Sequence, residues 1–237
     1  MTLIPQTDFT NLFASADMRV TPAEYGKFAR YADMLAEKNA VMNLTAITEP
    51  AEVAEKHFLD SVLPLKMFGI PEGATLVDVG AGAGFPSLPI AILRPDIKPT
   101  LIDSLNKRVL FLQDVSAALG INAECLHFRA EDAGQGSLRE SFDIAVARAV
   151  SRLSVLCEYC LPLVRVGGAF FALKGADCGE ELKAAYTAIK TLGGKTENVY
   201  EYSLPNGDGR TLVIIRKIAP TPKTYPRAQG KIKAKPL

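Results

Sequence analysis

The chain has 237 residues, of which 48% are hydrophobic and 22% are charged, and its formal net charge at pH 7 is +1. This composition excludes a largely disordered chain, no apolar run reaches the ~18 residues of a membrane span, and four cysteines in such a length do not form a disulfide framework. The first residues also lack the basic start of a signal peptide, so we expect one large domain with an appendage in the reducing cytoplasm.

Residues 1 to about 65 predict a helical extension. Thr21 is a suitable N-cap residue, Pro22 suits the first helical position, and apolar residues recur every three or four positions after them. A second helix is expected over residues 49–68, and no strand pattern occurs before Thr75.

From Thr75 onward, short apolar runs alternate with helical stretches, which predicts an α/β fold with a Rossmann-like, mostly parallel sheet. The seven expected strands are residues 75–80, 99–104, 123–128, 142–148, 167–174, 195–204 and 210–217. Only the turn-rich sequence PNGDG separates the last two, so we expect them to form a terminal antiparallel hairpin. The expected division of the chain is a helical extension over 1–65, a sheet-containing domain over 66–218 and a tail over 219–237.

Positive charge is concentrated at the C-terminus. Residues 216–237 contain seven basic and no acidic residues, which leaves 20 basic and 26 acidic residues in the rest of the chain. Because prolines also interrupt this segment, we expect an extended basic arm from Ala219 that binds a polyanion. The binding pocket of the core should not depend on the arm, because the expected sheet ends before Ala219. A disordered, solubilising tail is the alternative. The candidate contacts to the polyanion are Lys223, Arg227, Lys231, Lys233 and Lys235.

The sequence TLVDVGAGAGFPSLPIAIL, residues 75–93, passes from a strand through three glycines into a helix. Such a turn lets the backbone approach a ligand and points helix N–H groups at it. Gly80, Gly82 and Gly84 are each two residues apart, whereas the dinucleotide fingerprint places its third glycine three residues after the second. With Asp78 before them, this spacing is typical of S-adenosylmethionine sites, and a purely structural tight turn is the alternative.

Acidic residues follow the next two expected strands. Asp103 can accept hydrogen bonds from ribose hydroxyls, and Glu131 and Asp132 can meet an adenine amino group. An NAD-dependent oxidoreductase would also have an acidic residue at the ribose, so Asp103 does not distinguish the two functions. The terminal hairpin disfavours that function, as does the absence of a convincing acid–base pair among only two histidines. Titration with NADH, read by fluorescence, would test it.

Six motifs occur in order: VMNLTAIT, HFLDSV, VDVGAGAGFPSLPIAI, LIDSLNKRVLFL, ARAVSRL and ALKG. Together, over roughly residues 38–217, they resemble the bacterial 16S ribosomal RNA small-subunit methyltransferase G family, also called the glucose-inhibited division protein B family. The resemblance implies a Rossmann-like methyltransferase fold. It also implies transfer of a methyl group from S-adenosylmethionine to guanine N7 in 16S ribosomal RNA. The substrate is either the RNA itself or a 30S particle that contains it. The glycine loop and the resemblance together suggest these cofactor-binding residues: Asp78, Gly80, Gly82, Gly84, Phe85, Asp103, Ser104, Leu105, Ala130, Glu131 and Arg148.

The residues agree with the chemistry that the resemblance implies. Guanine N7 has an in-plane lone pair and no proton, so its methylation needs alignment and a suitable field rather than a general base. None of the four cysteines follows a proline, as the nucleophile of a cytosine-C5 enzyme commonly does. ARAVSRL stands where an adenine-N6 enzyme usually has an Asn/Asp-Pro-Pro-aromatic motif.

Arg148 and Lys174 end neighbouring strands, and we expect them to be the catalytic cations, with positioning roles only. Lys174, Asn39 and His57 are also candidates for RNA contact. Salt bridges at the strand ends are the alternative for the two cations, and a neutral, packed side chain is the alternative for the histidine.

Cys157 and Cys160 lie in a helical pattern without a second cysteine pair, so we expect buried thiols and no metal. We also expect a monomer that does not bind membranes. A non-catalytic ribosome-binding or assembly factor on the same fold is the rival from a different functional class. Calorimetry with S-adenosylmethionine would separate the two, because a binding module need not keep a cofactor cleft.

Overall fold

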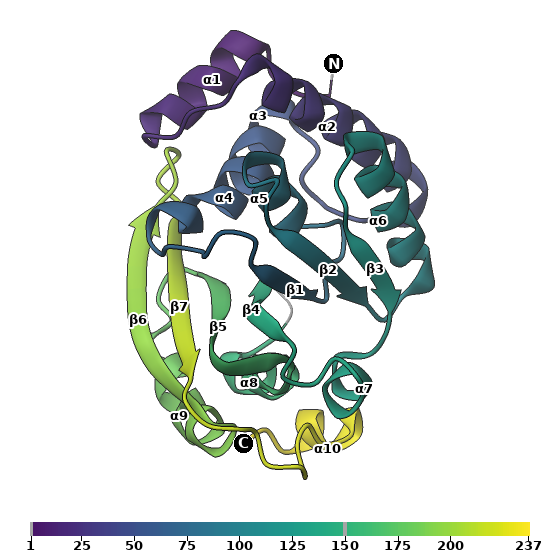
Figure 1. Ribbon diagram of the computed structural model, residues 1–237. Helices are drawn as coiled ribbons and strands as arrows, with labels where there is room; N and C mark the ends of the chain where they lie inside the picture. The colour runs from purple at the N-terminus through teal and green to yellow at the C-terminus, as the bar shows by residue number, and fades with distance from the viewer. Residues whose placement is uncertain (1, 149–150) are drawn as a thin grey trace.

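A seven-stranded sheet forms the centre of the molecule, with the strand order β3-β2-β1-β4-β5-β7-β6 (Figure 1). The computed structural model describes residues 2–148 and 151–237, so Ala149 and Val150 of the ARAVSRL motif lie outside the described residues. The strands are β1 (Thr75–Val79), β2 (Lys98–Asp103), β3 (Glu124–His127), β4 (Phe142–Arg148), β5 (Val164–Gly175), β6 (Gly194–Ser203) and β7 (Gly209–Lys217).

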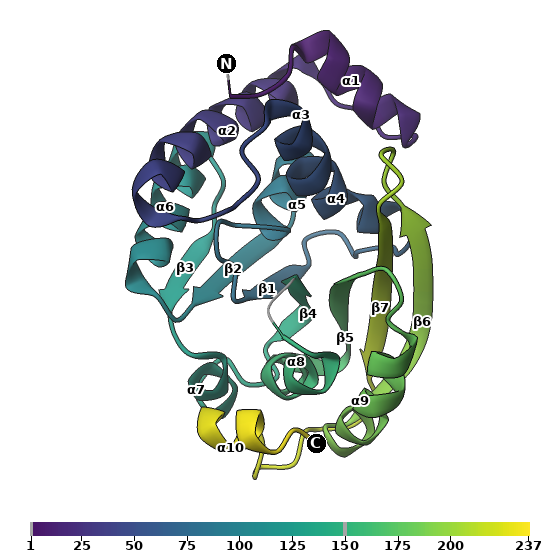
Figure 2. The same ribbon diagram turned by 180° about the vertical axis from the view of Figure 1, so that it is seen from behind.

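Helices cover both faces of this sheet (Figures 1 and 2). One layer consists of α1 (Gln6–Ser15), α2 (Pro22–Met42), α3 (Pro50–Glu52), the π-helical segment η1 (Val53–Leu59), α4 (Asp60–Val62), the short turn η2 (Leu63–Lys66), α5 (Ser87–Leu93) and α6 (Asn106–Leu119). The other consists of α7 (Ala130–Gln135), α8 (Leu153–Cys160), the short turn η3 (Leu161–Leu163), α9 (Gly179–Thr191) and α10 (Gln229–Ala234).

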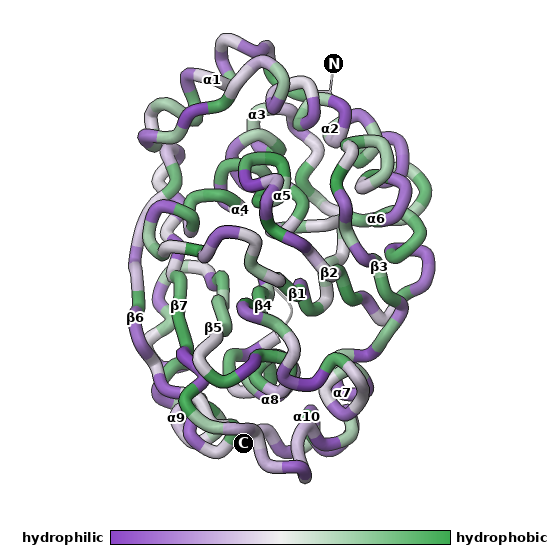
Figure 3. Tube along the Cα trace, viewed as in Figure 1, coloured by the Kyte–Doolittle hydropathy of each residue, from purple (hydrophilic) through white to green (hydrophobic). Residues whose placement is uncertain are grey.

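The central strands β1, β4 and β5 carry buried apolar residues on both faces, because helices cover each face. In β1, Val77 and Val79 belong to the core that also contains Leu156 of α8, whereas Leu76 packs with Ile90 of α5 on the opposite face. Hydrophobic segments are visible along β5 and β7 in Figure 3. Such runs are typical of strands in parallel sheets with helices on both sides.

The expected fold class is confirmed. Strands β1 to β5 pair in parallel, and β7 pairs antiparallel with both β5 and β6. The terminal hairpin predicted from the PNGDG turn is therefore present. Among the described helices, none combines the length and apolar character that a bilayer crossing requires.

The N-terminal helices pack tightly onto the sheet layer. Phe9, Phe13, Phe28 and Phe58 are fully buried and join one core with residues of α5 and α6. The rings of Phe28 and Phe58 lie 4.9 Å apart. The division at residues 65 and 218 stays a prediction, but the extension shares its core with the sheet-containing domain.

The prediction of an extended C-terminal arm is wrong. Residues 229–234 form helix α10, and the side chain of Ile232 is fully buried. The Arg227 guanidinium also binds the fully buried carboxylate of Glu158, with an Nη2–Oε2 distance of 2.7 Å. The proline and lysine content of residues 219–237 predicted an arm in solvent. The buried side chain of Ile232 and the Arg227–Glu158 ion pair instead help to hold this segment on the domain.

Helix α2 begins with a capping box. The Glu24 carboxylate accepts a hydrogen bond from the Thr21 backbone N–H at 2.7 Å, and the Glu24 N–H donates to the Thr21 hydroxyl oxygen at 3.3 Å. These bonds satisfy backbone donors that a helix start leaves without partners.

We therefore predict that Thr21→Ala lowers the free energy of unfolding by about 1 kcal/mol. Urea unfolding followed by circular dichroism measures this. Thr7→Ala is the matched control, because Thr7 is exposed in the first turn of α1 and has no side-chain hydrogen bond within the described residues. Equal stability of both variants and the wild type would show that the capping box contributes nothing.

Candidate active site

The glycine loop follows β1 at the carboxyl edge of the sheet. Gly80, Gly82 and Gly84 have φ angles of 74°, 59° and 100°, which favour glycine. A Cβ atom on Gly84 would lie 2.5 Å from the Tyr31 hydroxyl, so only glycine lets the Tyr31 side chain pack against the loop at this position. A Cβ on Gly82 would meet only the Gly80 carbonyl oxygen, at 3.8 Å, so this part of the loop borders open space.

Asp103, at the end of β2, holds the glycine loop in place. Its carboxylate accepts hydrogen bonds from the backbone N–H of Gly82 at 3.0 Å and of Leu105 at 2.9 Å. Arg108 lies 3.4 Å from the same carboxylate. The predicted ribose-binding residue thus connects the loops that follow β1 and β2.

Asp78 lies beneath the loop and is almost completely buried. Neither of its carboxylate oxygens has a hydrogen-bond partner within the described residues. Burial raises the pKa of Asp78 to about 7, although the nearby Ser87 and the charge of Arg148 oppose this shift. An unpartnered buried carboxylate directly under a glycine loop indicates a ligand-binding position.

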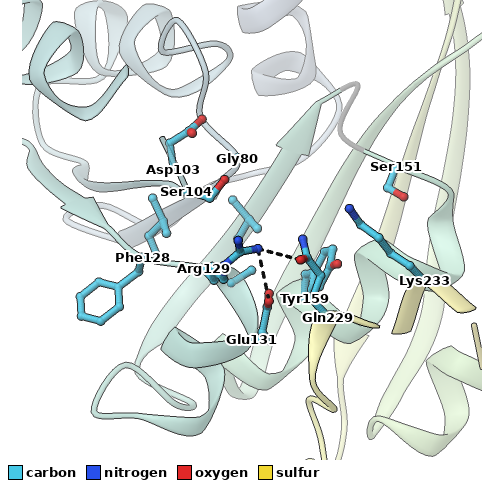
Figure 4. A pocket seen from close by; sticks show the side chains of 13 residues that line it. Gly80, Asp103, Ser104, Phe128, Arg129, Glu131, Ser151, Tyr159, Gln229 and Lys233 are labelled. Atoms are coloured by element: carbon cyan, nitrogen blue, oxygen red, sulfur yellow. Dashed lines mark hydrogen bonds and ion pairs between the residues drawn. The ribbon is translucent and has the colours of Figure 1, made fainter. Parts of the chain in front are cut away.

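A first cavity of about 160 Å³ lies at the ends of β1, β2 and β3 (Figure 4). It is lined by Val79, Gly80, Ile102, Asp103, Ser104, Phe128, Arg129, Ala130, Glu131, Ser151, Tyr159, Gln229 and Lys233. Five predicted cofactor residues meet here: Gly80, Asp103, Ser104, Ala130 and Glu131. The Tyr159 hydroxyl is buried without a partner in the described part of the chain. The cavity therefore offers polar groups that are ready to bind a ligand.

A second cavity of about 340 Å³ lies between the N-terminal helices and the ends of β4 and β5. Its lining is rich in positive charge and consists of Ile47, Lys56, His57, Asp60, Arg148, Leu173, Lys174, Gly175 and Arg210. Asp60 is its buried acidic group. Its two carboxylate oxygens each lie 3.1 Å from Nε of Arg210, and one lies 3.4 Å from Nη1 of Arg148.

Arg148 connects the second cavity to the glycine loop. Its guanidinium lies over the Phe85 ring at 5.0 Å from the centroid, a cation–π geometry. Burial lowers the pKa of Arg148, and the charge of Asp60 opposes this. The predicted residue is thus a buried cation within the site rather than a member of a surface salt bridge.

Lys174 is paired rather than free. Its ammonium lies 2.8 Å from the Glu181 carboxylate and donates a hydrogen bond to the Ser151 carbonyl oxygen at 2.9 Å. Lys174 also lines the second cavity, and RNA contact by its ammonium stays a prediction.

His57 packs on the glycine loop as a neutral side chain. Its ring stacks on Phe85 with centroids 4.5 Å apart and an interplanar angle of 8°, and Nε2 lies 2.8 Å from the Thr45 hydroxyl. Burial lowers the pKa of His57 to about 3, and the charge of Arg148 acts in the same direction. His57 therefore shapes the cavity without adding positive charge at neutral pH.

The remaining predicted RNA-binding residues differ in their surroundings. Both polar atoms of the Asn39 side chain bind the Thr45 backbone, each at 2.9 Å, so Asn39 braces the loop that reaches His57. Direct RNA contact by Asn39 stays a prediction. Arg227 binds Glu158, and Lys233 lines the first cavity. The exposed residues of this set are Lys223, Lys231, Lys233 and Lys235.

The two helical cysteines, Cys157 and Cys160, are fully buried thiols. Burial raises the pKa of both, which makes them unreactive. No group of three or more His, Cys, Asp and Glu side chains that could hold a metal occurs within residues 2–148 and 151–237.

Sequence reasoning missed several cavity residues. Asp60 stood in the HFLDSV motif and Arg210 at the start of an expected strand, and neither was named as a site residue. Tyr159 and Gln229 were missed because they reach the first cavity from helices distant in the chain. For Asp60, the available signal was an acidic residue surrounded by apolar ones.

Comparisons with known proteins agree on one family. The model of the family described as rRNA small subunit methyltransferase G matches residues 24–209. The ribosomal RNA small subunit methyltransferases G of Clostridium perfringens strain 13 and Bacillus subtilis strain 168 are each 48% identical to the chain. The alignments cover 94% and 97% of this chain and 95% and 98% of those proteins.

A solved structure shows the same fold. The crystal structure of a SAM dependent methyltransferase from Aquifex aeolicus aligns with a TM-score of 0.53 at 19% identity. The alignment covers 73% of this chain and 96% of that one.

We predict that His57 remains neutral between pH 8 and pH 5. Its burial beside Arg148 lowers its pKa to about 3, so the folded protein does not bind the proton that an unfolded histidine takes up near pH 6.5. His57 should therefore decrease stability as the pH falls below about 6.5, by about 1.4 kcal/mol per pH unit. Imidazole NMR signals, assigned with His57→Gln, measure the protonation state. A titration midpoint near pH 6.5 for the His57 imidazole would contradict this prediction.

Proposed function

The chain belongs to the rRNA small subunit methyltransferase G family, and on this premise we propose that it transfers the methyl group of S-adenosylmethionine to N7 of a guanine in 16S ribosomal RNA. Membership confirms the family predicted from the six sequence motifs. The observation that supports the proposal best is the pairing of two sites. A ligand cavity at the ends of β1 to β3 lies on one side of the glycine loop, and a cationic cavity contacts the same loop through Phe85 and Arg148.

The described residues fit S-adenosylmethionine. Gly82 borders open space, and the buried polar atoms of Asp78 and Tyr159 have no partners in the described residues. Asp103 and Glu131 would hold the ribose and the adenine. When bound, the cofactor supplies a methyl group on a positively charged sulfur, which makes that methyl group an electrophile.

The chain's task is to place the guanine and to exclude water. Guanine N7 carries no proton, so no residue has to act as a general base, and the neutral His57 is consistent with this. The cations Lys56, Lys174 and Arg210 line the second cavity, where they can bind RNA phosphates. Alignment of N7 with the methyl group then accounts for much of the rate enhancement.

The protein acts on its RNA as a monomer in the cytoplasm, with either 16S RNA or a 30S particle as the substrate. The four cysteines are free, which suits a reducing compartment.

Incubation with labelled S-adenosylmethionine and either 16S RNA or 30S particles tests this function. We expect label in 7-methylguanosine and, because N7 methylation leaves a positive charge on the base, chain cleavage after borohydride and aniline. Label only in 5-methylcytosine or N6-methyladenosine would contradict the chemistry. Cofactor binding in calorimetry without methylation of either substrate would favour the assembly-factor alternative.

We further predict that Gly82→Val abolishes S-adenosylmethionine binding, measured by calorimetry, because a branched side chain would enter the open space beside the loop. Gly73→Val is the matched control. Gly73 also has a positive φ of 66°, and a Cβ added there would have no atom within 4 Å, but this glycine precedes β1 at the other end of the strand. Both variants should lose about 1–2 kcal/mol of stability from backbone strain, and only Gly82→Val should lose the cofactor. Unchanged cofactor affinity in folded Gly82→Val would exclude this loop as the binding site.

A further inference from the structure

The chain continues beyond β7 as a segment that is fastened to the domain at several points. We call residues 220–234 the C-terminal strap. At its start, the ammonium of the fully buried Lys217 binds the Thr221 hydroxyl at 2.6 Å and the Glu140 carboxylate at 3.0 Å. The Thr221 backbone N–H donates to Glu140 at 2.7 Å. These contacts fix the direction in which the strap leaves the sheet.

The middle of the strap lies against α7. The Arg139 guanidinium donates hydrogen bonds to the carbonyl oxygens of Thr221 at 2.6 Å and Tyr225 at 2.7 Å, and the Gln135 amide donates to that of Pro226 at 2.8 Å. A Cβ atom on Gly134 would lie 2.9 Å from the Pro226 ring, so a glycine leaves the space that this ring fills.

The strongest attachment is an ion pair at Arg227. The fully buried Glu158 carboxylate accepts hydrogen bonds from the backbone N–H, Nε and Nη2 of Arg227, at 2.9, 2.8 and 2.7 Å. Bidentate pairs of this kind are strong and directional, and loss of one partner would leave a charge buried. Arg227 therefore holds the strap on the domain, and RNA contact by this residue stays a prediction.

Helix α10 brings two polar side chains to the first cavity. Ile232 is fully buried in the core beside α8, while Gln229 and Lys233, one helical turn apart, line the cavity (Figure 4). The Gln229 amide oxygen accepts a hydrogen bond from Arg129 at 2.7 Å, which leaves the amide nitrogen free to donate. Within residues 2–148 and 151–237, the Lys233 ammonium has no hydrogen-bond acceptor.

The position of this cavity indicates which part of the cofactor it receives. Its polar lining comes mainly from the ends of β2 and β3, through Asp103, Ser104 and Glu131, where the ribose and adenine are expected. Gly82, Gly84 and Phe85 do not line it. Adenine presents ring-nitrogen acceptors and an amino donor. Lys233 and Gln229 offer donors for the former, and Glu131 offers an acceptor for the latter.

We infer that the C-terminal strap is a wall of the cofactor site and that Gln229 and Lys233 bind the adenosine half of S-adenosylmethionine. This inference rests on the proposed function and replaces the prediction that the binding pocket of the core does not depend on the segment from Ala219 onward. Lys233, predicted from the sequence as an RNA contact, is assigned to the cofactor instead.

Calorimetry with two ligands tests the assignment. S-adenosylmethionine contains both halves of the cofactor, and 5′-methylthioadenosine lacks the amino-acid half. We expect Gln229→Ala and Lys233→Ala each to weaken the binding of both ligands by about threefold to tenfold, as for the loss of one hydrogen bond. Lys231→Ala is the matched control, since Lys231 is an exposed lysine of the same helix that does not line the cavity and should leave both affinities unchanged.

Hydrogen exchange provides a readout independent of substitution. The amides of residues 229–234 should exchange more slowly in wild-type protein when either ligand is bound. Thermal unfolding of each variant checks that the strap stays folded, and Lys233→Gln provides a milder change if Lys233→Ala loosens the helix.

The outcomes separate this inference from the proposed function. Failure of wild-type protein to bind S-adenosylmethionine would overturn the proposed function itself. Wild-type binding with unchanged affinities in both cavity variants would overturn the strap assignment alone. A loss confined to S-adenosylmethionine would place Gln229 and Lys233 at the amino-acid half and overturn the adenosine assignment.

Discussion

The site depends on one buried carboxylate that holds two guanidinium groups. Asp60 comes from the N-terminal helices, Arg148 from the end of β4 and Arg210 from the start of β7, and the Asp60 side chain is only 8% exposed. Removal of the carboxylate would leave two cations close together at low exposure, which is strongly unfavourable. The ion cluster therefore fixes the helical extension against the carboxyl edge of the sheet and gives the second cavity its shape.

From this cluster, a column of rings extends to the glycine loop. Arg148 lies over Phe85, His57 stacks on one side of that ring, and Tyr31 stacks near it with centroids 5.3 Å apart. The Tyr31 hydroxyl also donates a hydrogen bond to the Ala83 carbonyl oxygen within the loop. The glycine loop is thus held by residues such as His57 and Arg148 that also line the second cavity. The N-terminal helices are therefore a structural part of the second cavity and of the support of the glycine loop.

The C-terminal strap completes the site from the opposite side. The sheet provides only the floor, where the ends of β1 to β3 place Gly80, Asp103 and Glu131. Residues of the N-terminal helices line the second cavity, and residues of helix α10 line the first. Both ends of the chain therefore contribute to the two cavities beside the glycine loop. Anionic RNA that contacts the exposed Lys231 and Lys235 would lie on or next to helix α10, which borders the first cavity.

Local patterns in the sequence determined the strand segments along the chain, the cap at Thr21, the glycine loop and the terminal hairpin, because each depends on residues close together in the chain. The position of Asp103 and Glu131 at one cavity could also be predicted, since a parallel sheet brings the residues after its strands to one edge. The pairing of Asp60 with Arg210, which are 150 residues apart, was decided by the tertiary structure. The strap was decided in the same way. Its lysines predicted a solvated arm, but the domain offers a buried position for Ile232 and a buried carboxylate at Glu158 that needs a cation, and neither can be recognised from the residues around 227–234. The partner of a buried charge can be far away in the sequence, so the local pattern around either residue does not predict the pair.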